Sequence, residues 1–270
     1  MLALQKFFLF TLLALLFTQN PKQELNDQMF EAVRKGDAAT VASLLDKGAE
    51  VNAKFRYGQT ALFKAAERGY ADVVKVLLDR GVDVSVKDTF YGATAMTWAL
   101  DNNHVDVVRL LLEKTPASVD EVLLTGARED KEPMVKVALD RGGVKPQTLT
   151  LAYAIASGEG GSATILETLK KAGATPPPTV DAAVLQSYAG KYKGEAGPEV
   201  TVSVKDGKLF VAGFSRQPVP LMAVDATNFR PLAFDAISFM FNVEGGNVTG
   251  LSMKQGNNTT QLKRIAEVKQ

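Results

Sequence analysis

The sequence predicts an α+β protein of two domains, a helical solenoid of repeated helix pairs followed by a small antiparallel β-barrel. Over residues 25–175 the apolar residues follow a helical period, and a helix-pair pattern returns every 33 or 34 residues. Beyond residue 185 apolar and polar residues alternate, and turn residues separate the short runs. Three prolines at 176–178 lie between the two patterns, so we assign residues 176–184 to a linker.

Residues 58–81 contain the clearest helix pair. Residues 60–68 and 71–79 form two short amphipathic segments, and each is followed closely by a glycine, Gly69 or Gly81. Because helices this short are unstable alone, the unit must stack on copies of itself. The copies follow one spacing, as in the pairs Gly36 and Gly69, Gly48 and Gly81, Leu44 and Leu77, Tyr57 and Tyr91, and Ala65 and Ala99.

These repeated blocks resemble the ankyrin repeat. Its Thr-Pro-Leu-His opening is similar to Thr60-Ala61-Leu62-Phe63, without the proline and the histidine, and its closing Leu-Leu-x-x-Gly-Ala-x-Val-Asn-Ala is nearly whole in residues 44–53. The resemblance implies an ankyrin-repeat domain over residues 24–175 with about five repeats, of which the fourth, near 122–144, is degenerate. In the first repeat we expect helices at 27–35 and 39–46, with Asp37 capping the second helix.

The C-terminal part is predicted to form an antiparallel barrel over residues 185–267. Turn sequences such as Asp206-Gly207 join neighbouring strands as hairpins, and closure into a barrel removes exposed edges. Before the barrel, Asp181 is expected to cap a helical turn that runs to Gln186. About eight strands are expected, near 188–193, 199–205, 208–213, 217–223, 227–231, 236–243, 247–254 and 260–266.

This part resembles the domain of unknown function found C-terminal to many beta-lactamase-like serine hydrolases. The similar residues are Leu185-Gln186-Ser187-Tyr188-Ala189-Gly190-Lys191-Tyr192, residues 202–209, Phe239 and Gly250-Leu251. The resemblance implies a lipocalin-like barrel. Its interior is either a packed core or a pocket for an apolar ligand, and an eight-stranded barrel is only just wide enough for side chains to fill. The aromatic residues that crowd this part are Tyr188, Tyr192, Phe210, Phe214, Phe229, Phe234, Phe239 and Phe241.

The composition argues against an enzyme. The Ser-x-x-Lys motif of those hydrolases and the Gly-x-Ser-x-Gly elbow are both absent from the sequence. There is no cysteine, and the single histidine, His104, is expected to pack locally where the ankyrin Gly-His pair places a histidine. With 31 basic and 30 acidic side chains the net charge is +1, which gives no footprint for nucleic acid. We therefore expect no catalytic residues, metal, cofactor or nucleic-acid partner.

The N-terminus predicts export. Lys6 precedes a mostly apolar run at 7–17, which is too short to span a bilayer and has the length of a secretion signal. We interpret residues 1–20 as a signal peptide. The protein is then expected in the periplasm or outside the cell, or anchored in the membrane if the signal is not cleaved.

Two aromatic stretches point to a binding surface, Phe55-Arg56-Tyr57-Gly58 and Thr89-Phe90-Tyr91-Gly92. The ankyrin resemblance places both stretches on the hairpin fingers, whose tips contact partners together with the exposed turn of the inner helices. These rings either bind a partner or brace neighbouring fingers, and Trp98 is either in the binding face or in the core. The positions carried over from the family are Arg56, Tyr57, Gln59, Glu67, Arg68, Phe90, Tyr91, Ala93, Trp98, Asp101 and Asn102.

The sequence thus predicts an exported ankyrin-repeat protein that binds an unidentified protein partner through its concave face, with a non-catalytic accessory barrel. Two alternatives stay open. The barrel could carry a small apolar ligand, or the protein could regulate an exported serine hydrolase.

Overall fold

The structure, a computed structural model, describes residues 21–158, 160–195, 199–213, 215–232, 234 and 237–265. The predicted signal peptide at 1–20 and the barrel residue Phe214 lie outside these residues. The chain divides into two compact units, residues 1–122 with 140–143 and residues 123–139 with 144–270. The domain boundary at 176–184 stays a prediction.

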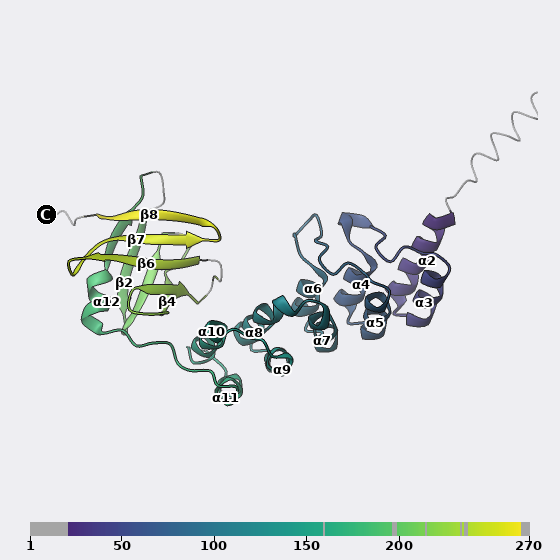
Figure 1. Cartoon of the computed structure of the whole chain (residues 1–270), viewed down its shortest axis with the longest axis horizontal. Helices are drawn as coiled ribbons and strands as arrows, with labels where there is room; N and C mark the ends of the chain where they lie inside the picture. Colours follow the sequence, from purple (N-terminus) through teal and green to yellow (C-terminus); the bar gives the residue numbers. More distant parts are fainter. Residues whose placement is uncertain are drawn as a thin grey trace, which may run out of the picture. The chain divides into compact units, whose positions relative to one another are not determined.

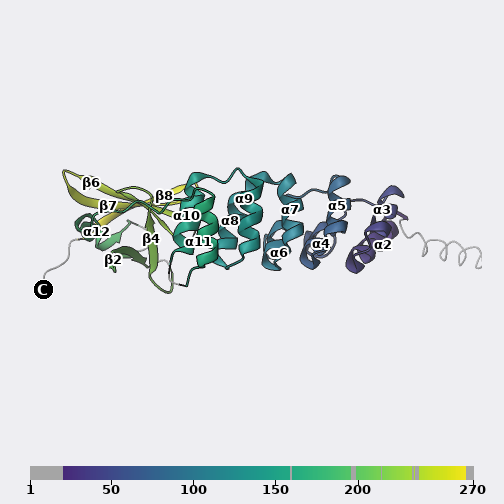
Figure 2. The same ribbon diagram turned by 90° about the horizontal axis from the view of Figure 1, so that it is seen from below.

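The first unit is a stack of helix pairs (Figure 1). The inner helices α2, α4 and α6 pack against one another in order, the outer helices α3, α5 and α7 do the same, and the two rows are distinct in Figure 2. This arrangement confirms the predicted solenoid. The pairs are α2 (Pro21–Lys35) and α3 (Ala38–Asp46), α4 (Ala61–Arg68) and α5 (Ala71–Asp79), and α6 (Ala95–Asp101) and α7 (Val105–Lys114), followed by a short 3₁₀ helix, η2 (Pro116–Ser118).

Local sequence signals explain where these helices begin. Asp37 caps α3, as predicted, because its carboxylate accepts a hydrogen bond of 2.9 Å from the backbone N–H of Thr40. Thr94 caps α6 and exchanges hydrogen bonds with Thr97. The described part of α2 begins at Pro21, so the first inner helix is longer than the 27–35 segment that the apolar period marked. Its additional turns are mostly exposed, which is why the apolar pattern missed them.

A glycine at the end of each of the first two inner helices makes room for the next repeat. Gly36 and Gly69 both have positive φ, +74° and +73°. A Cβ on Gly36 would lie 3.2 Å from the ring of Tyr70, and a Cβ on Gly69 would overlap the imidazole of His104. Tyr70 and His104 occupy equivalent positions one repeat apart, so the same ring-on-glycine contact joins successive repeats.

Replacing Gly69 with alanine is expected to destabilise the first unit more than replacing Gly81. Both glycines have positive φ, which by itself costs alanine about 1–2 kcal/mol, but a Cβ on Gly81 would meet open space. The difference between the two variants in urea unfolding therefore measures the clash with His104. Equal losses would mean that the imidazole moves aside freely.

Two further helix pairs follow in the chain. The segment predicted as a degenerate fourth repeat forms two helices, and Gly126 allows their close approach because a Cβ there would lie 2.9 Å from the backbone nitrogen of Val135. In the segment predicted as the fifth repeat Ser162 caps the second helix, accepting a hydrogen bond of 3.4 Å from the N–H of Ile165. The four helices are α8 (Val119–Arg128), α9 (Glu132–Arg141), α10 (Pro146–Ala156) and α11 (Ala163–Lys171).

The C-terminal strands form a closed antiparallel barrel in the order β1 to β8, which confirms the predicted architecture (Figure 1). Asp181 caps helix α12 (Ala182–Tyr188), which contacts β2 and β7. Because this helix continues through Tyr188, β1 starts two residues later than expected. The strands are β1 (Gly190–Lys193), β2 (Glu199–Lys205), β3 (Lys208–Ala212), β4 (Val219–Ala223), β5 (Asn228–Pro231), β6 (Ile237–Glu244), β7 (Asn247–Gln255) and β8 (Asn258–Ile265).

Aromatic rings pack together in the buried core of the barrel. Phe241 stacks on Tyr188 with ring centroids 4.0 Å apart and meets the rings of Tyr192 and Phe229 edge-on at 6.0 and 5.6 Å. The hydroxyl of Tyr192 donates to the carbonyl of Tyr188 at 2.7 Å, and burial raises the pKa of Tyr192 to about 12. Phe234, expected among the core aromatics, is instead exposed. The rings in this region therefore form a packed core.

Candidate protein-binding groove

The two aromatic stretches form neighbouring fingers that project from the row of inner helices (Figure 1). The first finger closes through a hydrogen bond of 2.8 Å from the N–H of Phe55 to the carbonyl of Gln59, and its tip is the 3₁₀ turn η1 (Arg56–Gly58). In the second, the N–H of Asp88 donates to the carbonyl of Ala93 at 2.9 Å. The N–H of Thr89 donates to the carbonyl of Tyr57 at 2.9 Å, so the backbones of the two fingers are directly connected.

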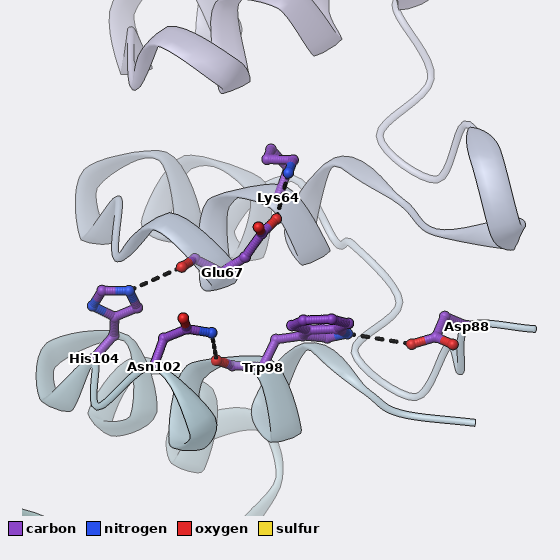
Figure 3. Close-up of polar contacts among 6 residues, drawn as sticks. All are labelled: Lys64, Glu67, Asp88, Trp98, Asn102 and His104. Carbon is purple, nitrogen blue, oxygen red and sulfur yellow. Dashed lines mark hydrogen bonds and ion pairs between the residues drawn. The ribbon is translucent and has the colours of Figure 1, made fainter. Parts of the chain in front are cut away.

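Asp88 holds the shape of the second finger. Its buried carboxylate accepts hydrogen bonds at Oδ1 from the N–H groups of Phe90 (2.9 Å) and Tyr91 (2.6 Å). The other oxygen, Oδ2, accepts from the indole Nε1–H of Trp98 at 3.2 Å (Figure 3). These hydrogen bonds hold the pKa of Asp88 below its usual value, and the bond from the Tyr91 N–H has the largest effect. The side chain is therefore ionised at neutral pH.

Four aromatic rings form a continuous chain across the fingers. The ring centroids of Tyr57 and Phe90 lie 5.6 Å apart, those of Phe90 and Tyr91 4.6 Å, and those of Tyr91 and Trp98 6.0 Å. Despite these contacts, Tyr57 is 43% exposed, Phe90 65% and Tyr91 71%. The rings thus support one another and still present most of the Phe90 and Tyr91 surface to solvent.

The rings border a groove of about 390 Å³ between the two fingers. Trp98 is only half-buried and contributes to the groove wall instead of the core. Six of the eleven residues predicted to bind a partner meet here. The full lining consists of Tyr57, Gln59, Phe63, Glu67, Phe90, Tyr91 and Trp98.

The other five predicted residues lie around or beyond the groove. The guanidinium carbon of Arg56 lies 4.7 Å from the centre of the Tyr57 ring, a cation–π contact on the finger tip. Ala93 is half-buried, and its carbonyl closes the second finger. Arg68, Asp101 and Asn102 are exposed at the ends of the inner helices, outside the groove lining.

Polar contacts position the inner-helix side of the groove (Figure 3). The carboxylate of Glu67 forms an ion pair with Lys64, one turn earlier on α4. The backbone carbonyl of Glu67 lies 3.0 Å from Nε2 of His104, which is the local packing role expected for that histidine. The side-chain amide of Asn102 donates to the carbonyl of Trp98 at 2.8 Å and so closes the C-terminal turn of α6.

Phe63 and Asp88 belong to the site but were not predicted from the sequence. Phe63 is buried and closes the groove from below, at the position where the ankyrin opening has its histidine. The short sequence Asp88-Thr89-Phe90-Tyr91 does contain a signal, because an aspartate that accepts from backbone N–H groups two and three residues later is typical of a tight turn. The bond from Trp98 to Asp88 depends on tertiary packing and has no such local signal.

Within the ranges that the structure describes, no group of three or more histidine, cysteine or acidic side chains is placed to hold a metal. In the same ranges no helix has the length and apolar character needed to cross a bilayer.

Stacked helix pairs with paired fingers are the architecture of a helical repeat protein. Family comparison agrees: residues 29–122 match three copies of the ankyrin repeat, and residues 174–267 match a domain of unknown function, DUF3471. The chain therefore contains ankyrin repeats in its N-terminal part and a DUF3471 domain in its C-terminal part. No curated protein matches it at a significant level.

Proposed function

We propose that the protein is exported and binds a protein partner through the finger groove, while the barrel has a non-catalytic accessory role. Ankyrin repeats generally bind proteins, which supports the proposal that this protein has a protein partner. The assignment of binding to the finger groove rests on one observation. Tyr57, Phe90 and Tyr91 are exposed beside Trp98, on fingers that share a backbone hydrogen bond.

The arrangement of these rings favours binding over bracing. A brace needs to be covered by its neighbour, yet Phe90 and Tyr91 leave about two thirds of their surface in water. Exposed aromatic side chains that are already held in place lose little conformational entropy on binding, and tyrosine and tryptophan are enriched among residues that dominate binding energy. The charged residues at the rim, Arg56 and Arg68, would each contribute about 1 kcal/mol or less.

Replacing Tyr57 or Tyr91 with alanine is therefore expected to weaken partner binding by about 2 kcal/mol each. The partner is first captured with the wild-type protein and identified, and its affinity for each purified variant is then measured. Because Tyr91 is largely exposed and Tyr57 lies on an exposed finger tip outside the repeat core, the melting temperature should change little.

Phe234→Ala is the matched control, since Phe234 is also an exposed aromatic residue but lies outside the groove. This variant should bind like the wild type. If Tyr57→Ala and Tyr91→Ala lower the melting temperature and leave the affinity unchanged, the finger rings are braces and the binding face lies elsewhere.

Export is proposed from the N-terminal sequence alone, on Lys6 and the apolar run at 7–17. A chain lacking residues 1–20 should accumulate as folded protein in the cytoplasm of the expressing cell, whereas the full chain should leave it. Fractionation followed by immunoblotting distinguishes the two locations. Equal export of both chains would refute the proposal.

The alternatives receive less support. The rings around Phe241 are buried and packed against one another, which favours an accessory role over carriage of a small apolar ligand. Regulation of an exported serine hydrolase is supported only by the resemblance of the barrel sequence to domains attached to such enzymes.

A further inference from the structure

We infer that the partner places an arginine side chain in the finger groove. This inference rests on the proposed function, because it names the chemistry that the same groove would recognise. The lining consists of five aromatic side chains, one amide and one carboxylate, and it includes no basic residue. Such a surface is complementary to a cation that is also flat enough to stack on rings.

One acidic side chain lines the groove. Glu67 lines it directly, and Lys64 pairs with one oxygen of its carboxylate, Oε2. A guanidinium entering along the aromatic wall would approach the other oxygen, Oε1. Because a guanidinium carries five donors, it can bond this carboxylate and remain stacked on a ring at the same time.

A second carboxylate, that of Asp88, is ionised and lies at the N–H edge of the Trp98 indole. It accepts the indole N–H at 3.2 Å, and its other hydrogen bonds come from backbone N–H groups of the finger, so these donors are neutral. A carboxylate at the N–H edge adds negative potential to the indole and polarises the ring, which strengthens the attraction between the indole face and a cation. The groove thus has two carboxylates beside its ring faces, that of Glu67, which is paired with Lys64, and that of Asp88, at the N–H edge of Trp98.

The chain itself contains an arginine–tyrosine contact beside the groove. The guanidinium of Arg56 already lies 4.7 Å from the centre of the Tyr57 ring. This contact uses the same chemistry that we infer for the partner, on a ring that lines the groove. Arginine suits the site better than lysine because its planar head stacks on rings and is less strongly hydrated than an ammonium group.

Fluorescence provides a direct test because Trp98 is the single tryptophan of the chain. The full-length protein is titrated with the acetylated and amidated peptide Gly-Ser-Arg-Ser-Gly, and with peptides in which citrulline or lysine replaces the arginine. Citrulline keeps the shape of arginine and removes its charge. We expect a saturable change in Trp98 emission at millimolar arginine peptide, with affinity about threefold or more higher than for the citrulline peptide.

Two variants locate the contact. Glu67→Gln should reduce affinity for the arginine peptide and leave that for the citrulline peptide almost unchanged. Glu167→Gln is the matched control, because Glu167 pairs with Lys170 at the same three-residue spacing and lies outside the groove lining. This control should behave like the wild type. Circular dichroism melting of each variant shows whether it is folded.

Equal binding of the arginine and citrulline peptides, or no saturable change with the arginine peptide, would overturn the inference. Tighter binding of the lysine peptide would overturn the choice of arginine. If the peptides fail while Tyr57→Ala and Tyr91→Ala still weaken the captured partner, only the arginine inference is wrong. If those variants also bind normally, the proposed function fails with it.

Discussion

Replacing Leu77 with alanine is expected to lower the free energy of unfolding of the first unit by about 2–5 kcal/mol. Leu77 lies in α5, the outer helix of the second repeat, and its side chain is completely buried. This helix contacts α3, α4 and α7, so helices of three repeats surround its buried face. A short helix in a solenoid obtains most of its stability from such contacts, and a cavity here weakens two repeat interfaces at once.

Lys75→Ala is the control, because Lys75 is an exposed residue of the same helix and alanine is a good helix former. Urea unfolding followed by far-ultraviolet circular dichroism measures both variants. A loss below about 1 kcal/mol for Leu77→Ala would contradict the assignment of this side chain to the repeat core.

Phe241→Ala is expected to destabilise the barrel by about 3–5 kcal/mol. Phe241 contacts three other buried rings of the core, since it stacks on Tyr188 and meets Tyr192 and Phe229 edge-on. Removing it takes away three ring contacts and leaves a cavity that the closed barrel cannot collapse around easily. Tyr188 would also lose the partner that holds the end of α12 against the strands.

Met240→Ala provides the comparison, because Met240 precedes Phe241 on β6, points to the other face and is 44% exposed. Its loss should change the free energy of unfolding by about 0.5 kcal/mol or less. If both substitutions have the same small effect, the interior of the barrel is not a packed core and a ligand pocket becomes the better account.

Most of the fold followed from periodicity and turn chemistry. Alternation of apolar residues gave eight strands with bounds close to those observed, because one face of every strand is buried in the barrel. The helix pairs were predictable for the same reason, at a period of 3.6. The start of α2 was not, since the residues after Pro21 are mostly exposed and have no apolar pattern to mark them.

The candidate site was predictable only in part. The finger rings Tyr57, Phe90 and Tyr91 could be found because the ankyrin resemblance places both aromatic stretches on the fingers, yet the sequence did not tell whether they bind or brace. The exposed fractions of these rings and the distances between them favour binding over bracing. Both quantities depend on how two fingers from successive repeats pack together. Asp88 and Phe63 were missed because their roles follow from tertiary contacts.

Quenching of Trp98 fluorescence by acrylamide tests directly whether a protein partner occupies the finger groove. Trp98 is half-buried in the groove wall and is the single tryptophan of the chain. Acrylamide quenching is measured for the free protein and for the complex with the captured partner, in which the partner's tryptophans are replaced with phenylalanine. We expect a saturating concentration of the partner to lower the quenching constant of Trp98 several-fold. A saturated complex in which Trp98 is quenched as readily as in the free protein would contradict it.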